Sequence, residues 1–205
     1  MWIWLQDNHG AVSAIANMAT LVVWTLYFQL LLGNYRDRIR PKILINQGAG
    51  HSLRSHCLIA NMSAEPIYVE AVITDAGYRS GSDKAFRRSR CSLSDLDLEV
   101  SDQGDRRPQW LQGPLDSSEL IDIGTYQQLI DRTMTQGETA DTIDELTVTI
   151  VATYTARDRP VAARRSFDVR RSRHGTRLEP RTYTAEQIRS RAALRSIRAY
   201  MQETQ

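Results

Sequence analysis

The sequence predicts a mainly β fold: an N-terminal transmembrane helix, an antiparallel β-sandwich and a C-terminal amphipathic helix. Three observations lead to this fold class. An uncharged apolar run occupies residues 11–32, several short segments rich in branched residues follow it, and residues 184–203 carry apolar and arginine side chains at a helical period.

The apolar run predicts a membrane-spanning helix over residues 11–33. Residues 11–32 carry no charge, and as a helix they measure roughly 33 Å at about 1.5 Å per residue, close to a hydrocarbon thickness of about 30 Å. A buried helix of a soluble domain is the alternative, but such helices are usually shorter and have a polar face. We expect the rings of Trp24 and Tyr27 to settle at headgroup level.

The charges that flank the run predict its direction across the membrane. Residues 1–10 hold no Lys or Arg, whereas residues 34–41 are rich in arginine. Since positive residues favour the cytoplasmic side, we expect the N-terminus outside and the following domain in the cytoplasm. A cleaved secretory signal would have the opposite charge polarity. The cations expected to hold anionic headgroups are Arg36, Arg38, Arg40 and Lys42.

Small polar residues in the first half of the span predict contact with another helix, including self-association. Ser13, Asn17 and Thr20 lie three or four positions apart, so a second backbone can approach them closely. An interhelical hydrogen bond from Asn17 is worth about 0.6 to 2 kcal/mol. The alternative is that Asn17 bonds to carbonyls of its own helix or to an interfacial water.

Composition agrees with a cytoplasmic domain; the lipid bilayer and an unknown protein are the partners expected from the span and the tail. Cys57 and Cys91 are the only cysteines, too few for the disulfide framework of a secreted module. The net charge is +2, and of the 26 basic residues only Lys42 and Lys84 are lysine. Such a bias is a weak signal for nucleic acid, and we do not expect a nucleic-acid partner.

Residues 42–171 predict the β-sandwich, because short apolar segments alternate with turn-forming residues. Strands are expected at residues 42–47, 55–63, 66–76 and 90–100, and a further short strand is expected around residues 120–123, within the stretch 113–124. A short helix is expected at residues 125–134. Within the third strand, a period of two is expected to gather on one face the side chains of Ile67, Val69, Ala71 and Ile73.

The clearest strand signal is a late hairpin. Residues 144–155 alternate apolar and threonine side chains, "ARDRP" gives the loop, and the strand returns over residues 161–170 with Phe167 and Val169 inward. The inward residues expected on the first strand are Leu146, Val148, Ile150, Ala152 and Tyr154.

This pattern resembles an immunoglobulin-like or fibronectin-like sandwich over residues 41–171. The late hairpin then corresponds to the last two strands, and Tyr154 to the tyrosine that such folds bury. The chain lacks the Cys, Trp, Cys order of antibody domains, since Trp110 follows both cysteines. In "NQGAG", "CLIANMSAEPIY" and "DIGTY" the chain also resembles small single-span proteins of Gram-negative bacteria. That likeness implies an inner-membrane location and no particular activity.

No catalytic, cofactor or metal site is predicted, and no cofactor is expected. His51, His56 and Cys57 are potential metal ligands, but their spacing fits no usual zinc pattern. "GAGH" lacks the Lys and the Ser or Thr of a phosphate-binding loop. Asp95 and Asp97 fall on one strand face, where solvated carboxylates are ordinary.

The tail is expected to form a basic linker at residues 172–183 and an amphipathic helix at residues 184–203. Thr184 and Gln187 have capping-box spacing. One helix face gathers Ala193, Leu194, Ile197, Tyr200 and Met201, and the other gathers Arg191, Arg195 and Arg198. Three alternatives stay open: the helix packs on its own sandwich, lies on the anionic inner leaflet, or binds a partner protein or nucleic acid.

Two function classes follow from these expectations. The first is a membrane-anchored cytoplasmic interaction module, or accessory subunit, that holds a partner protein at the inner membrane. The second is an enzyme whose site in the sandwich carries no recognisable motif. The tail residues expected to make the interaction are Arg191, Leu194, Arg195, Ile197, Arg198 and Met201.

Overall fold

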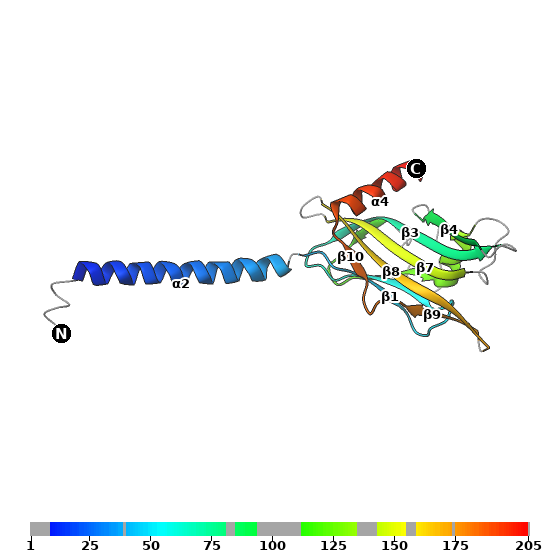
Figure 1. The fold of residues 1–205 in the computed structure, drawn as a ribbon, viewed down its shortest axis with the longest axis horizontal. Helices are drawn as coiled ribbons and strands as arrows, with labels where there is room; N and C mark the ends of the chain where they lie inside the picture. Colours follow the sequence, from blue (N-terminus) through cyan, green and yellow to red (C-terminus); the bar gives the residue numbers. More distant parts are fainter. Residues whose placement is uncertain are drawn as a thin grey trace. The chain divides into compact units, whose positions relative to one another are not determined.

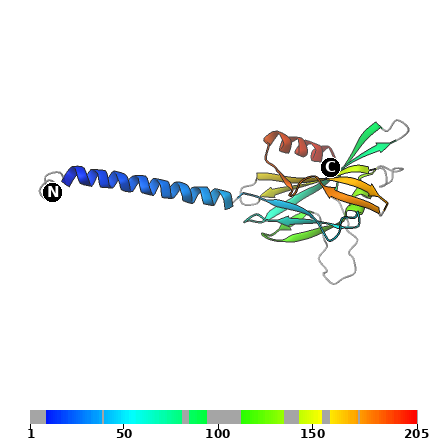
Figure 2. The same ribbon diagram turned by 60° about the horizontal axis from the view of Figure 1, so that its bottom comes forward.

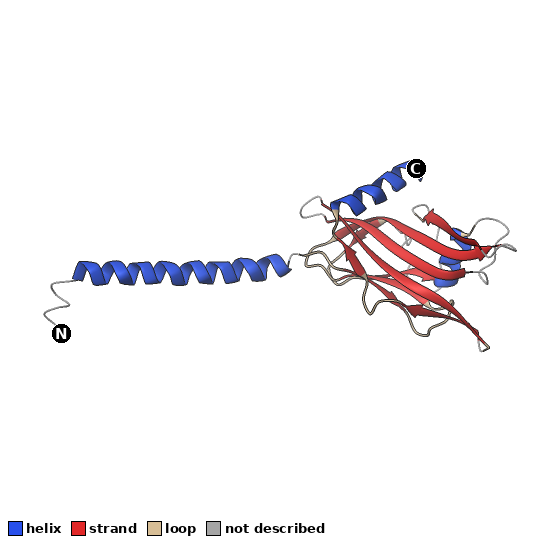
Figure 3. Cartoon of the chain, viewed as in Figure 1, coloured by secondary structure: helices blue, strands red, loops and turns tan. Residues whose placement is uncertain are grey.

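The computed structural model describes residues 9–38, 40–80, 85–93, 112–134, 143–154, 159–173 and 175–204. The chain divides into two compact units, Met1–Arg40 and Pro41–Gln205. The described helices are α2 (His9–Arg38), α3 (Tyr126–Thr133) and α4 (Arg191–Thr204). The described strands are β1 (Ile43–Gln47), β2 (His56–Asn61), β3 (Ile67–Ser80), β4 (Ala85–Ser92), β5 (Gly113–Leu115), β6 (Leu120–Thr125), β7 (Ile143–Tyr154), β8 (Arg159–Ser172), β9 (Gly175–Pro180) and β10 (Glu186–Ile188). Figure 3 distinguishes the helices from the strands.

The first unit contains α2, which is long and apolar enough to cross a membrane by length and composition. It includes the expected span of residues 11–33 and continues through the first basic residues to Arg38. Its large apolar side chains are exposed, including Ile15, Trp24 and Phe28. No other helix among the described residues meets the same criteria.

The second unit is built on antiparallel sheets, as the sequence predicts (Figure 1). Among the described residues the larger sheet has seven strands, with β8, β7 and β3 at its centre, and the smaller sheet has three in the order β1-β2-β6. One edge of the larger sheet is formed by β9 and β10, which pair with successive parts of β8. The other edge is formed by β4 and β5, which pair with successive parts of β3.

The late hairpin is confirmed by β7 and β8, which pair from Glu145↔Asp168 to Tyr154↔Arg159. Unbroken alternation places the predicted residues in the core, among them Ile150, Phe167 and Val169. The Phe167 ring packs edge to face on Tyr126 of α3, with ring centroids 4.9 Å apart. Of the expected "ARDRP" loop, residues 156–158 lie outside the described residues, and Arg159 and Pro160 belong to β8 rather than to the loop.

The prediction for the third strand is wrong, because β3 contains a bulge. The register with β7 shifts between Val69 and Ala71, and one extra residue reverses the face of every later side chain. Ile67 and Val69 therefore lie in the main core, whereas Ala71 and Ile73 lie in a separate cluster on the opposite face.

The C-terminal boundaries also differ from the prediction. The expected linker at residues 172–183 contains β9, and the expected first turns of the helix contain β10. The helix begins at Arg191, so Thr184 and Gln187 do not form its capping box. Gln187 instead bonds to the backbone of β1: Ile43 N donates to its Oε1 at 3.1 Å, and its Nε2 donates to Ile43 O at 2.6 Å.

The middle of the domain agrees in part. The expected helix at residues 125–134 is confirmed by α3, which begins with a capping box between Thr125 and Gln128. The short strand expected around residues 120–123 is confirmed by β6, and the stretch 113–124 also contains β5, which the sequence did not predict. β4 begins before and ends within the expected strand at residues 90–100, of which residues 94–100 lie outside the described residues.

The core lies between the sheets, and α4 covers the other face of the larger sheet (Figure 2). Side chains from both sheets and from α3 form one buried cluster, which includes Ile45, Ile59, Ile130, Val148 and Phe167. On the outer face, a smaller cluster of Ala71, Ile73 and Val151 packs against α4. The domain therefore has three layers: the smaller sheet, the larger sheet and α4.

Candidate functional site

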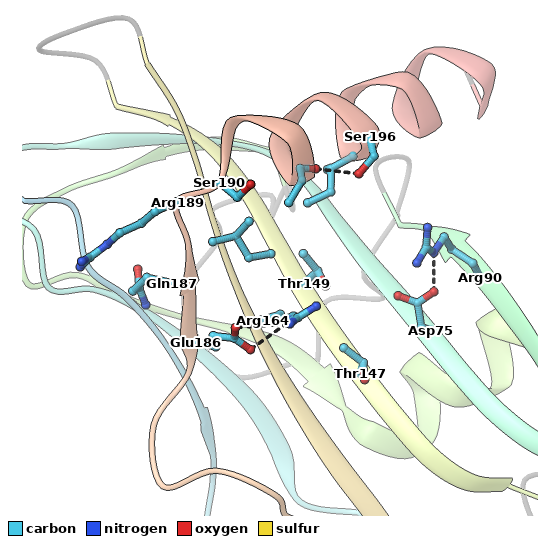
Figure 4. A pocket seen from close by; sticks show the side chains of 13 residues that line it. Asp75, Arg90, Thr147, Thr149, Arg164, Glu186, Gln187, Arg189, Ser190 and Ser196 are labelled. Atoms are coloured by element: carbon cyan, nitrogen blue, oxygen red, sulfur yellow. Dashed lines mark hydrogen bonds and ion pairs between the residues drawn. The ribbon is translucent and has the colours of Figure 1, made fainter.

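A groove of about 470 Å³ lies between α4 and the outer face of the larger sheet (Figure 4). We call it the α4 groove. Side chains from β3, β4, β7, β8, β10, α4 and the two residues between β10 and α4 line it: Asp75, Arg90, Thr147, Thr149, Arg164, Glu186, Gln187, Ile188, Arg189, Ser190, Ala193, Ser196 and Ile197.

The alternation of β7 explains the floor of the α4 groove. Thr147 and Thr149 point away from the core because their neighbours Leu146 and Val148 fill it. The Thr147 hydroxyl lies 2.8 Å from Oγ of Ser166 on β8, within hydrogen-bond distance. The floor of the groove is therefore polar, although it belongs to a sheet whose other face is apolar.

The apolar face of α4 positions the roof of the groove. Ile197, Tyr200 and Met201 pack on the outer cluster of β3 and β7, and the guanidinium of Arg90 lies 5.1 Å from the centroid of the Tyr200 ring. Of the three alternatives for the tail helix, the structure places it on its own sheet. The first residues of α4 and the preceding Ser190 then overhang the threonines of β7.

Ion pairs lie on both sides of the groove. Asp75 of β3 binds Arg90 of β4, and Arg164 of β8 binds Glu186 of β10, with Nε and Oε2 2.9 Å apart. Exposed pairs of this kind contribute about 0 to 1 kcal/mol to stability. The walls of the groove therefore present positive and negative side chains beside hydroxyl groups. This arrangement suits a polar ligand with hydrogen-bond donors and acceptors along its length.

The predicted tail residues separate into two groups. Ile197 and Met201 contact the sheet, whereas Arg191, Arg195 and Arg198 are exposed. Leu194 is half-buried and joins the three arginines and Pro160 around a second cavity of about 390 Å³. The structure thus brings the predicted residues together on one helix, but on different sides of it.

The predicted residues of α2 are also exposed. Trp24 and Tyr27 pack edge to face with centroids 6.0 Å apart, and the Thr20 hydroxyl donates to Ala16 O at 2.8 Å within the helix. Ser13 and Asn17 lie on the same helix with their side chains exposed. Association through these residues stays a prediction.

The basic segment at residues 34–41 is divided between elements. Arg36 and Arg38 belong to the last turns of α2, and Arg40 follows it. Lys42 comes directly before β1, where its backbone N donates to Ser63 Oγ at 3.0 Å and its carbonyl accepts from Met62 N at 2.8 Å. Lys42, which follows the segment, is therefore fixed to the β domain.

Sequence reasoning missed a buried arginine. Arg165 of β8 is only 7% exposed; its Nη1 donates to Asn46 Oδ1 at 3.1 Å and to Ile45 O, and its Nη2 donates to Tyr183 O at 3.2 Å. The period of two along β8 could have predicted its burial, because Arg165 lies two positions before the inward Phe167 and so shares its strand face. This guanidinium links β8 to β1 and to the segment before β10.

The histidines and cysteine considered as metal ligands do not converge. His56 and Cys57 are neighbours on β2, so their side chains point to opposite faces. His56 Nδ1 lies 2.6 Å from Asp122 Oδ2 at the surface, whereas Cys57 is fully buried. Burial raises the pKa of the Cys57 thiol to about 12, and a hydrogen bond from Tyr126 opposes that rise.

Comparisons with protein-family models, with curated proteins and with solved structures found no match to this chain. The resemblance to small single-span proteins of Gram-negative bacteria therefore stays a prediction.

Proposed function

We propose that this chain is a membrane-anchored interaction module or accessory subunit, which holds a partner protein at the inner membrane of a bacterium. The observation that carries the proposal is the exposure of α2. Its apolar side chains are uncovered around the whole helix, with Ile15 70% and Trp24 64% exposed. Because burial of such a side chain is worth about 1.5 to 3 kcal/mol, lipid is the surrounding that stabilises this helix.

The proposal includes the direction of the anchor and the finer fold. The basic residues after the span favour a cytoplasmic β domain. The antiparallel sheets around one core are compatible with an immunoglobulin-like sandwich, which we keep as part of the proposal. α2 also associates with another helix through Ser13, Asn17 and Thr20, and Asn17→Leu lowers that association in a membrane two-hybrid assay.

The α4 groove is the partner site in this proposal. Its hydroxyl floor and its paired charges offer donors and acceptors over a cavity of about 470 Å³, which matches the backbone and polar side chains of an extended peptide segment. A protein partner held there stays at the membrane as long as α2 is inserted.

The anchor is tested by charge substitution. Leu21→Arg together with Leu26→Arg places two cations near the middle of α2, at a cost of about 2.5 to 3.5 kcal/mol each in a bilayer. We expect the wild type to stay with membranes at alkaline pH and the double variant to leave them. Tyr35→Arg, close to the basic end, is the control that stays. A periplasm-dependent phosphatase fused after Gln205 should be inactive; activity there would overturn the direction.

The partner site is tested by site-specific crosslinking in cells. A photoreactive residue at Arg189, in the groove, should capture one discrete partner. The same residue at Leu120, exposed on β6 of the smaller sheet, is the control. The captured protein should leave the membrane fraction when α2 carries the two arginines. Equal capture at both positions, or a partner whose location ignores α2, would refute the module.

A further inference from the structure

The side of α4 opposite the groove carries a second cavity. Pro160 of β8 and Leu194 of α4 are its apolar residues, and the cavity measures about 390 Å³. Its remaining lining residues are Arg191, Arg195 and Arg198, spaced four and three positions apart so that they follow one stripe of the helix. We call this site the arginine cavity.

The arginine cavity concentrates positive charge. No described carboxylate lies within ion-pair distance of its three guanidinium groups. Arg195 Nε donates to Arg191 O at 3.3 Å, which turns its guanidinium back along the helix toward Arg191. Like charges three or four positions apart destabilise a helix by a few tenths of a kcal/mol per pair. A bound anion would relieve this repulsion.

We propose that the arginine cavity binds the headgroup of an anionic phospholipid. Guanidinium groups hold phosphate oxygens with paired, directional hydrogen bonds, and the apolar surface of Leu194 and Pro160 receives the glycerol and the first methylenes of an acyl chain. An inorganic anion would use only the hydrogen bonds from the guanidinium groups and not the apolar surface. The mixture of cations and apolar surface therefore favours a lipid over free phosphate.

This inference rests on the proposed membrane anchor. Residues 39–42 separate α2 from β1, a stretch of roughly 14 Å at most when fully extended. An inserted α2 therefore tethers the β domain beside the lipid surface. In this arrangement α4 makes two contacts, because its apolar face is fixed to the sheet while its arginine stripe meets the headgroups.

Hydrogen exchange of the full chain in lipid nanodiscs tests the site. We compare discs of phosphatidylcholine with discs that also contain phosphatidylglycerol, and follow amide exchange over residues 191–204. The wild type should exchange several-fold more slowly in the anionic discs. The triple variant Arg191→Gln, Arg195→Gln and Arg198→Gln should lose that difference. The matched control replaces three other exposed arginines, Arg87, Arg173 and Arg177, and should keep it.

Each other outcome overturns the inference in a recognisable way. Equal exchange of the wild type in both discs means that the cavity does not meet anionic lipid. Loss of the difference in the control variant means a general effect of charge. Slower exchange in phosphatidylcholine discs on addition of inorganic phosphate assigns the site to a free anion. Failure of the chain to enter the discs contradicts the anchor itself, whereas insertion without α4 protection leaves the anchor intact.

Discussion

The two faces of the larger sheet come from the same strands but are covered in different ways. The inner face presents large apolar side chains such as Val148 and Ile150 to the smaller sheet and α3. The outer face presents threonines and ion pairs, and only the small patch of Ala71, Ile73 and Val151 is covered by α4. A sheet face with so little apolar surface can hold one helix and still keep a polar groove beneath it.

The difference predicts that changes on the inner face lower the stability of the whole domain, whereas changes on the outer face act on α4. The largest effect is expected for Phe167→Ala, since Phe167 is fully buried against Tyr126. We expect a loss of about 3 to 5 kcal/mol. The measurement is urea unfolding of a shortened chain, Pro41–Gln205, which we predict to fold as a soluble β-rich monomer. Tyr183→Ala, at a 97% exposed position, is the control; equal midpoints would contradict the assignment of faces.

Two neighbouring arginines on β8 sharpen the comparison. Arg165→Ala should lower the free energy of unfolding by about 2 to 3 kcal/mol, because the buried carbonyl oxygen of Ile45 loses its donor and the partly buried bond to Tyr183 O is also lost. Arg164→Ala removes an exposed pair with Glu186 and should cost about 0 to 1 kcal/mol. Both values come from the same urea unfolding measurement. A larger loss of stability for Arg164→Ala than for Arg165→Ala would contradict the assignment of Arg165 to the inner face and Arg164 to the outer face.

A substitution on α4 should detach the helix and leave the core folded. Ile197→Ala removes an apolar contact with the outer patch and should weaken the packing of α4 on the sheet by about 1 kcal/mol. Trypsin should then cleave at Arg195 and Arg198 several-fold faster, with little change in the urea midpoint. Ala199→Ser, at an exposed position of the same helix, should leave the cleavage rate unchanged. Cooperative loss of the whole domain in Ile197→Ala would show that α4 belongs to the core.

The smallest effect on the free energy of unfolding at neutral pH is expected from Cys57. The effect of its thiol becomes measurable only in alkaline solution. Burial raises the pKa of its thiol from 9.0 to about 12, so between these values the folded chain keeps a proton that the unfolded chain releases. Its contribution to stability is complete below pH 9 and is lost as the pH rises toward about 12. Unfolding measured across this range should depend less steeply on pH in Cys57→Ala. Cys91→Ala is the comparison: burial raises the pKa of the Cys91 thiol as well, but Cys91 is less buried, so its removal should flatten the pH dependence less than that of Cys57. An unchanged slope in Cys57→Ala would contradict the buried thiol.

The late hairpin was predictable because its period of two is unbroken from Leu146 to Tyr154. The faces of β3 were not, since the bulge between Val69 and Ala71 depends on pairing with β7 and leaves no mark in the composition. β10 was assigned to the helix because short polar segments fit both patterns, and here pairing with β8 decides. The α4 groove was beyond prediction, because it needs a helix laid across strands that are distant in sequence.

The amide of Gln187 has a consequence for the order of synthesis. It bonds to both backbone groups of Ile43, 144 positions earlier in the chain, on the side of β1 away from β2. A ribosome that adds about 5 to 20 residues per second needs roughly 7 to 30 s to make the stretch between them. During that time the first strand of the domain has an open edge that only the nascent C-terminal segment can close. An α2 already inserted in the membrane would keep this unfinished edge apart from the edges of other nascent chains.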